Sequence, residues 1–191
     1  MKKVKKELDK VFDNIQSESF TLQSGEYEQC NFNNLDLAGS DMSGFRFINC
    51  TFNACNMGNA VLNKTSFIDV SFKGCKLVGL HFDTCNEFLF TPRFEQCILD
   101  YASFHKLTLK KTVFIHCSML EVDFEDADLS GLVLENCNLA GTVFINTNLE
   151  KTDFTTSYNY SIDSEKNKIK KARFSMNGIA GLLDKYDIAI E

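Results

Sequence analysis

An apolar residue recurs at every fifth position over most of this chain of 191 residues. An α-helix repeats every 3.6 residues and a strand every two, so neither element accounts for a period of five. The period runs from Leu22 to Phe82, slips by two residues, and resumes from Leu89 to Phe154. A fixed period kept over so many units is the signature of a repeat protein, in which each unit stacks on its neighbours.

The residues between these apolar centres indicate how one unit is shaped. The position two before the centre is often small or apolar, as at Cys55, Ala60 and Ala102, and the other three positions are mostly polar or glycine. Asn, Asp and Gly favour turns. We therefore expect a short strand and a quarter-turn in each unit. Four units then close one coil of twenty residues, and backbone hydrogen bonds join the stacked coils.

The cysteines follow the same pattern. All eight lie two residues before a centre or before its expected place, and no pair has the close spacing of a zinc site. They behave as small buried hydrophobic residues, so we expect reduced thiols in the core, with disulfide or metal use as the alternative. The eight are Cys30, Cys50, Cys55, Cys75, Cys85, Cys97, Cys117 and Cys137.

The two-residue slip is interpreted as a bulge or loop inside a single unit. Leu89 is then expected to point inward on the face that follows Phe82. Columns that are twenty residues apart elsewhere then continue across the slip at a spacing of 22, as from Phe72 to Phe94. The segment 83–93 is either a structural bulge or a partner-binding loop, with Phe88 or Phe90 exposed. This register also aligns five cysteines in one interior ladder: Cys55, Cys75, Cys97, Cys117 and Cys137.

The repeat resembles that of the pentapeptide-repeat family, whose loose consensus is A(D/N)LXX. Matching units include residues 127–131 (ADLSG), 137–141 (CNLAG) and 152–156 (TDFTT), and the resemblance covers residues 20–157. It implies an all-β solenoid: a right-handed quadrilateral parallel β-helix of about seven coils.

The two ends depart from the five-residue period. Residues 1–15 carry Val4, Leu8, Val11, Phe12 and Ile15 at helical spacing, which predicts a short N-terminal helical cap. Residues 158–191 form a separate tail. It is expected to contain a helix over 178–184, capped by Ser175 or Asn177, and a strand over 186–190. The tail either caps its own last coil or joins the same surface of a second copy.

The tail is similar to the ending of the quinolone-resistance (Qnr-type) and microcin-immunity branch of the family. This resemblance implies a homodimer formed through the C-terminal tail. The candidate dimer residues are Ile179, Leu182, Leu183, Tyr186, Ile188 and Ile190.

The charge is concentrated in the repeats. The chain carries a net charge of −6, but residues 14–157 carry 9 basic and 18 acidic groups. An acidic rod repels nucleic acid and attracts basic, DNA-binding surfaces. The Qnr-type resemblance implies a DNA mimic that binds DNA gyrase or topoisomerase IV. The candidate binding residues are Glu121, Asp123, Glu125, Asp126, Asp128 and Glu135.

Two observations favour an alternative function. Acidic groups on one coil also serve solubility, and the chain lacks the longer projecting loops of the mobile quinolone-resistance proteins. The alternative is a structural or scaffolding protein with an unrelated protein partner.

An enzyme is not expected. The three histidines, His81, His105 and His116, are expected to point outward, and neither a catalytic constellation nor a phosphate-binding loop is present in the sequence. We expect no catalytic, cofactor-binding or metal-binding residues. The basic N-terminus is not followed by an apolar signal segment, and no apolar run approaches membrane-spanning length. A cytoplasmic protein without a membrane or nucleic-acid partner is therefore expected.

Overall fold

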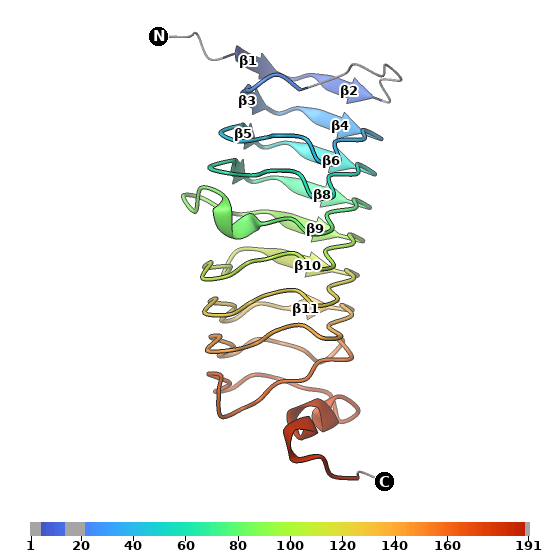
Figure 1. The fold of residues 1–191 in the computed structure, drawn as a ribbon, viewed down its shortest axis with the longest axis vertical. Helices are drawn as coiled ribbons and strands as arrows, with labels where there is room; N and C mark the ends of the chain where they lie inside the picture. Colours follow the sequence, from blue (N-terminus) through green and yellow to red (C-terminus); the bar gives the residue numbers. More distant parts are fainter. Residues whose placement is uncertain (1–4, 14–21, 190–191) are drawn as a thin grey trace.

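The computed structural model describes residues 5–13 and 22–189, which form a rod of stacked coils (Figure 1). Every paired segment runs parallel to a segment about one coil later in the chain, as from Phe32 to Phe52. The all-β parallel solenoid expected from the period of five is confirmed. Among the described residues, no helix is long and apolar enough to cross a membrane.

The regular strands lie on two sides of the coil. One sheet has the order β1-β3-β5-β7 and the other has the order β11-β10-β9-β8-β6-β4-β2. The first sheet contains β1 (Lys5–Leu8), β3 (Gly25–Glu28), β5 (Arg46–Ile48) and β7 (Ser66–Ile68). The second contains β2 (Val11–Asp13), β4 (Asn31–Asn33), β6 (Thr51–Asn53), β8 (Ser71–Lys73), β9 (Arg93–Glu95), β10 (Val113–Ile115) and β11 (Leu134–Glu135).

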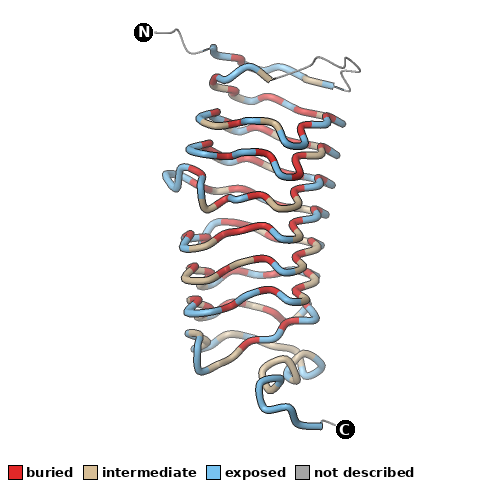
Figure 2. Tube along the Cα trace, viewed as in Figure 1, coloured by how far each residue is buried: buried red, intermediate tan, exposed pale blue. Residues whose placement is uncertain are grey.

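Isolated bridges hold the other two sides. The pairs Asp41↔Val61 and Ser103↔Asp123 are examples, and each is parallel. The centre of each regular unit points into the rod, so buried residues recur along every coil (Figure 2). The rings of successive coils stack, for example Phe32 on Phe52 with centroids 4.5 Å apart. Such columns fill the interior with apolar side chains.

Side chains two residues before the centre add a second, polar link between coils. Cys55 Sγ donates to the Phe32 carbonyl at 3.3 Å, and Thr152 Oγ1 donates to the Leu129 carbonyl at 2.8 Å. Donor and acceptor are 23 residues apart in both cases. Cysteine and threonine therefore make the same hydrogen bond to the preceding coil at these positions. This bond gives the buried thiol a hydrogen-bond partner.

The expected cysteine ladder is confirmed. Bridges that join residues 56, 76, 98, 118 and 138 place the preceding cysteines in one column. All eight cysteines are buried free thiols.

The slip lies within one unit, as expected. Phe72 pairs with Phe94, and Cys97 donates to the Phe72 carbonyl across 25 residues instead of 23. The inward position of Leu89, however, is wrong. Phe90 is 6% exposed and packs edge-to-face on Phe82, whereas Leu89 is 51% exposed with a φ of 57°. The larger phenylalanine ring fills the core, and Leu89 takes the turn.

The helix predicted for residues 1–15 is wrong over 5–13, the part that the structure describes there. These residues form β1 and β2, with Lys5 opposite Gly25 and Phe12 opposite Phe32. Phe12 stacks on Phe32 at 4.9 Å, and this contact with the aromatic column outweighs the helical spacing. Val4 and Ile15 lie outside the described residues.

The C-terminal segment continues the rod before it covers the end. Arg173 bridges to Asp153, and Phe174 stacks on Phe154 at 5.3 Å. The helical segment consists of two 3₁₀ turns, η2 (Ile179–Leu182) and η3 (Asp184–Tyr186), in place of the helix expected over 178–184. A further short turn, η1 (Phe82–Thr84), precedes the slip.

The strand expected over 186–190 is wrong for residues 186–189, and Ile190 lies outside the described residues. These residues have no neighbouring strand to pair with at the end of the rod. The Ile162 amide instead donates to the Gly181 carbonyl at 2.8 Å, and Leu182 packs against the core. Lys185 joins η3 to the preceding turn through Asp163 at 2.7 Å and Glu165 at 2.9 Å. The tail thus caps its own last coil.

Candidate functional site

Five of the six candidate acidic residues lie on two successive sides of a single coil, with Glu121 and Asp126 at consecutive turns. Asp123 and Glu125 flank the buried Phe124, and Asp126 turns the chain toward the next side with a φ of 59°. We name this surface the acidic corner, defined by Glu121, Asp123, Glu125, Asp126 and Asp128.

Glu135 is not part of the acidic corner. It lies in β11, and its neighbouring centre Leu134 comes ten residues, or two quarter-turns, after Phe124. Glu135 therefore faces the opposite side of the rod.

Two members of the acidic corner have side-chain partners, of which only the partner of Asp128 is charged. Lys110 Nζ lies 3.1 Å from Asp128 Oδ2, and Asn146 donates to Asp126. Burial opposes ionisation of Asp128, but hydrogen bonds from Ser130 and the charge of Lys110 hold the pKa of this carboxyl below its ordinary value. Asp128 is therefore ionised at neutral pH.

The other carboxylates of the corner lack cationic partners of this kind. No ion pair with Lys or Arg within the described residues involves Glu121, Asp123 or Glu125. The Asp123 side chain is held in place locally, because its Oδ1 accepts the Glu125 amide at 2.8 Å. The corner therefore presents negative charge outward from a rigid scaffold.

The structure also brings His105 to this surface, although no sequence motif indicated it. His105 is half-buried, whereas His81 and His116 are exposed. Its Nδ1 lies 4.0 Å from Asp123 Oδ2. His105 is 20 residues before Glu125, so the coil length itself was the available signal.

The C-terminal end presents the candidate dimer residues. Ile179, Tyr186 and Ile188 are exposed, and Met176 beside them is 83% exposed. Leu182 and Leu183 are half-buried, and Leu182 packs on the last coil. The end of the rod therefore combines a covered core with outward apolar side chains.

The irregular unit adds a second apolar feature. Phe88 is 71% exposed and follows Asn86, whose Oδ1 accepts the Phe88 amide at 3.0 Å. Phe88 and Leu89 are both exposed, and their segment belongs to the green loop that bulges out from the stack of coils in Figure 1.

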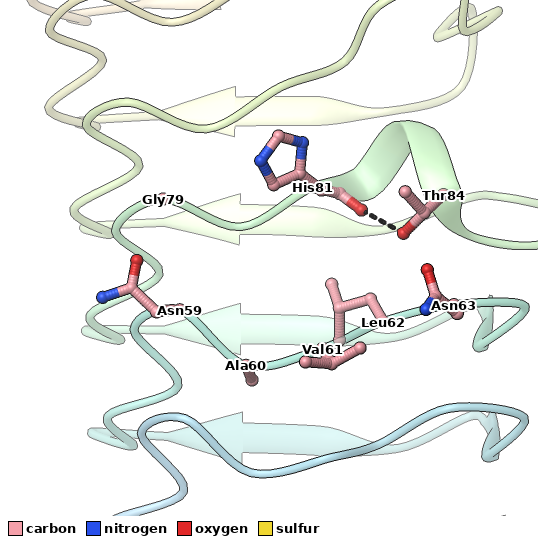
Figure 3. A pocket seen from close by; sticks show the side chains of 8 residues that line it. All are labelled: Asn59, Ala60, Val61, Leu62, Asn63, Gly79, His81 and Thr84. Atoms are coloured by element: carbon pink, nitrogen blue, oxygen red, sulfur yellow. Dashed lines mark hydrogen bonds between the residues drawn. The ribbon is translucent and has the colours of Figure 1, made fainter.

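An open groove lies between two coils near this loop. Figure 3 shows its lining, which comes from residues 59–63 and from Gly79, His81 and Thr84. Thr84 Oγ1 donates to the His81 carbonyl at 2.8 Å and so makes a local turn contact. His81 Nδ1 lies 3.3 Å from Asp83 Oδ1, and the residues that line the groove contribute no thiol.

Comparison with solved structures gives the same architecture. Two trypsin-treated variants of QnrB1, described as a plasmid-mediated fluoroquinolone resistance protein, match with a TM-score of 0.62. They are 18% and 20% identical, and each alignment covers 98% of both chains. At this identity the likeness establishes the fold. No protein of curated function matches the sequence significantly.

The sequence itself identifies the family. The pattern of the pentapeptide repeat region matches residues 45–114 and 87–157, which together span more than half of the chain. These segments contain the slip, the cysteine ladder and the acidic corner. The five-residue period and its coils of twenty residues thus have a family assignment: the chain belongs to the pentapeptide-repeat proteins.

Proposed function

We propose that this chain is a non-enzymatic protein-binding module of the cytoplasm whose partner is a type II topoisomerase, DNA gyrase or topoisomerase IV. The observation that carries the proposal is the acidic corner, where five carboxylates of one coil line two successive sides of a rigid rod. The Qnr-type resemblance of the sequence supplies the partner class. Basic, DNA-binding surfaces are the natural counterpart of such a corner.

The second part of the proposal is a homodimer formed through the C-terminal end. The exposed side chains of Met176, Ile179, Tyr186 and Ile188 support it, because apolar side chains exposed at the end of a polar rod favour association with an identical surface. Two copies joined at this end present two acidic corners on one longer rod.

The decisive experiment measures DNA supercoiling by gyrase, with and without a quinolone, as the protein is added. We expect the protein to inhibit supercoiling or to protect it from the drug. The triple variant Glu121→Gln, Glu125→Gln and Asp126→Asn should lose this effect, while Glu135→Gln on the opposite side should retain it. If the unaltered protein changed neither the activity of gyrase and topoisomerase IV nor their inhibition by a quinolone, the proposal would be wrong.

The dimer is tested separately by light scattering. The unaltered chain should have twice the mass of one chain at micromolar concentration, and Ile188→Asp should reduce it to one. Ile98→Asp, at a similarly exposed position midway along the rod, is the matched control. A single-chain mass for the unaltered protein would contradict the dimer and leave the topoisomerase proposal standing.

The alternative partner is an unrelated protein bound through apolar contacts, and the exposed Phe88 and Leu89 favour it. Phe88→Ser should then abolish capture of that partner while leaving any gyrase effect intact. A gyrase effect lost in Phe88→Ser but kept in the acidic triple variant would reverse our assignment of the binding surface.

A further inference from the structure

Three side chains of metal-ligand type converge on the side of the rod that carries the acidic corner. One ligand atom each from His105, Asp123 and Glu125 lies within 4.8 Å of the other two. All three side chains are half-buried. The sequence separates His105 from Asp123 by 18 residues, so the stacking of two coils creates the group.

The imidazole is poised for a ligand. The Nδ1 atom of His105 is fully buried and has no hydrogen-bond partner among the described residues. A buried polar atom without a hydrogen-bond partner is costly, and coordination to an ion would satisfy it. The nearest acidic atom, Asp123 Oδ2, is 4.0 Å away, which is too far for a hydrogen bond.

The same separation suits an ion between the two atoms. A metal with bonds of about 2 Å in tetrahedral geometry holds its ligand atoms about 3.3 Å apart. A side-chain adjustment of less than ~1 Å would reach that spacing. The Asp123 carboxylate is already oriented for this role, because its Oδ1 accepts the Glu125 amide at 2.8 Å and leaves Oδ2 toward His105.

The scaffold beneath the three residues is rigid. Phe104 and Phe124, the centres between which the group forms, stack at 5.3 Å, and the Phe104 amide donates to the Asp123 carbonyl at 2.8 Å. The two coils therefore keep the ligands in place before an ion arrives, which lowers the cost of binding.

We propose that His105, Asp123 and Glu125 form a binding site for a divalent first-row transition-metal ion such as Zn²⁺ or Co²⁺. One imidazole nitrogen and two carboxylate oxygens suit these ions, whereas Mg²⁺ and Ca²⁺ prefer sites made of oxygen alone. Three protein ligands leave at least one position open for water or for a group of a binding partner. The site shares Asp123 and Glu125 with the acidic corner, so a bound ion offsets part of its negative charge. The test below measures metal binding without gyrase, so the two proposals fail separately.

The test is calorimetric titration of the full chain with Zn²⁺ and with Co²⁺, and with Mg²⁺ as a comparison. We expect one ion of Zn²⁺ or Co²⁺ per chain and no saturable Mg²⁺ binding. His105→Gln should weaken the affinity at least about tenfold, and Asp123→Asn should do the same. Asn retains the oxygen that accepts the Glu125 amide, so Asp123→Asn separates loss of the ligand charge from loss of the turn. His116→Gln, an exposed histidine outside the group, is the matched control and should bind as the unaltered chain does.

Spectroscopy of the Co²⁺ complex guards against binding by the cysteines. Imidazole and carboxylate ligands give weak visible bands, whereas thiolates add an intense charge-transfer band in the near ultraviolet. We also expect Co²⁺ to perturb the proton resonances of one histidine ring of the three, and this signal should vanish in His105→Gln. A thiolate band, unchanged affinity of His105→Gln, or equal loss in His116→Gln would each overturn the proposal. Far-ultraviolet circular dichroism establishes that each variant is folded.

Discussion

The corners of the coils require a backbone conformation that most side chains avoid. Gly39 has a φ of 65° and Ala54 has a φ of 49°, and both lie at the same position of their units. For residues with a Cβ this left-handed region costs about 1–2 kcal/mol, while glycine enters it freely. Alanine in place of glycine should therefore destabilise the protein at position 39, and glycine in place of alanine should stabilise it at position 54.

We expect Gly39→Ala to lower the free energy of unfolding by about 1 kcal/mol and Ala54→Gly to raise it by about 0.5 kcal/mol. A Cβ on Gly39 would meet no atom within 4 Å, so its cost reports the backbone alone. Urea denaturation followed by circular dichroism measures both changes. If both substitutions changed the free energy of unfolding in the same direction, backbone conformation would not determine which residue is favoured at the corners.

The cap over the last coil depends on a close approach that only glycine permits. A Cβ added to Gly181 would lie 2.0 Å from the Tyr160 carbonyl oxygen. Gly181→Ala should therefore displace η2, break the hydrogen bond from the Ile162 amide and cost about 2 kcal/mol. Limited proteolysis should become faster near the C-terminus. Gly39→Ala is the control, because it adds the same methyl group in open space; equal proteolysis of the two variants would contradict the steric argument.

At the scale of elements, the irregular unit offers two nearby phenylalanines that differ in burial and can be compared directly. Phe90 is buried and Phe88, two residues earlier, is exposed. We expect Phe90→Ala to destabilise the protein by about 3–4 kcal/mol, because it leaves a cavity beside Phe82, and Phe88→Ala to change stability by less than about 0.5 kcal/mol. Denaturant midpoints of the two variants check this. Similar losses in both would mean that Phe88 also packs in the core.

Most of the fold follows from the sequence because inward positions repeat at fixed spacing. The columns, and the placement of the slip in one unit, needed only residue types twenty apart, or 22 apart across the slip as for Phe72 and Phe94. The choice among Phe88, Leu89 and Phe90 could not be made in this way. All three residues are apolar. The two extra residues of the slip interrupt the five-residue period, so the period does not indicate which of the three points inward.

The N-terminal error has a different cause. Phe12 lies 20 residues before Phe32 and so fits the column of apolar centres. Glu7, however, occupies the position in β1 that pairs with Tyr27, so the five-residue series of apolar residues does not extend to the N-terminus. Glu7 is 8% exposed, and salt bridges to Lys10 and Lys5 hold the pKa of its carboxyl below the ordinary value. A paired carboxylate thus replaces an apolar centre where the rod begins. The site was predicted in part, because the sequence indicated the acidic residues. Only the stacking of the coils shows that His105 lies beside Asp123. It also shows that Glu135 lies on the opposite side of the rod.

At the scale of the whole molecule, the buried thiols make stability depend on alkaline pH. Burial raises the pKa of the Cys50 thiol to about 11 and also raises that of Cys85. An unfolded cysteine ionises near pH 8.5. The stabilising effect is therefore complete below about pH 8.5 and is lost as the pH rises toward 11, because thiolates form more readily in the unfolded chain.

We expect the urea midpoint to fall between about pH 8 and about pH 10 under reducing conditions. Cys50→Ser should make this fall shallower, because the hydroxyl can donate to the Tyr27 carbonyl as the thiol does and does not ionise in this range. A midpoint that stays constant over this interval would contradict the account.

The constant distance between paired residues has a consequence for how such a chain changes in evolution. Each coil offers the next one the same backbone edge and the same ring columns, as Phe32, Phe52 and Phe72 illustrate. An in-frame duplication or loss of one whole coil therefore keeps every contact type and only alters the length of the rod. A shorter insertion must be absorbed within one unit, as between Cys85 and Pro92. The family can thus vary the span between its two ends by genetic steps of one coil without redesigning its core.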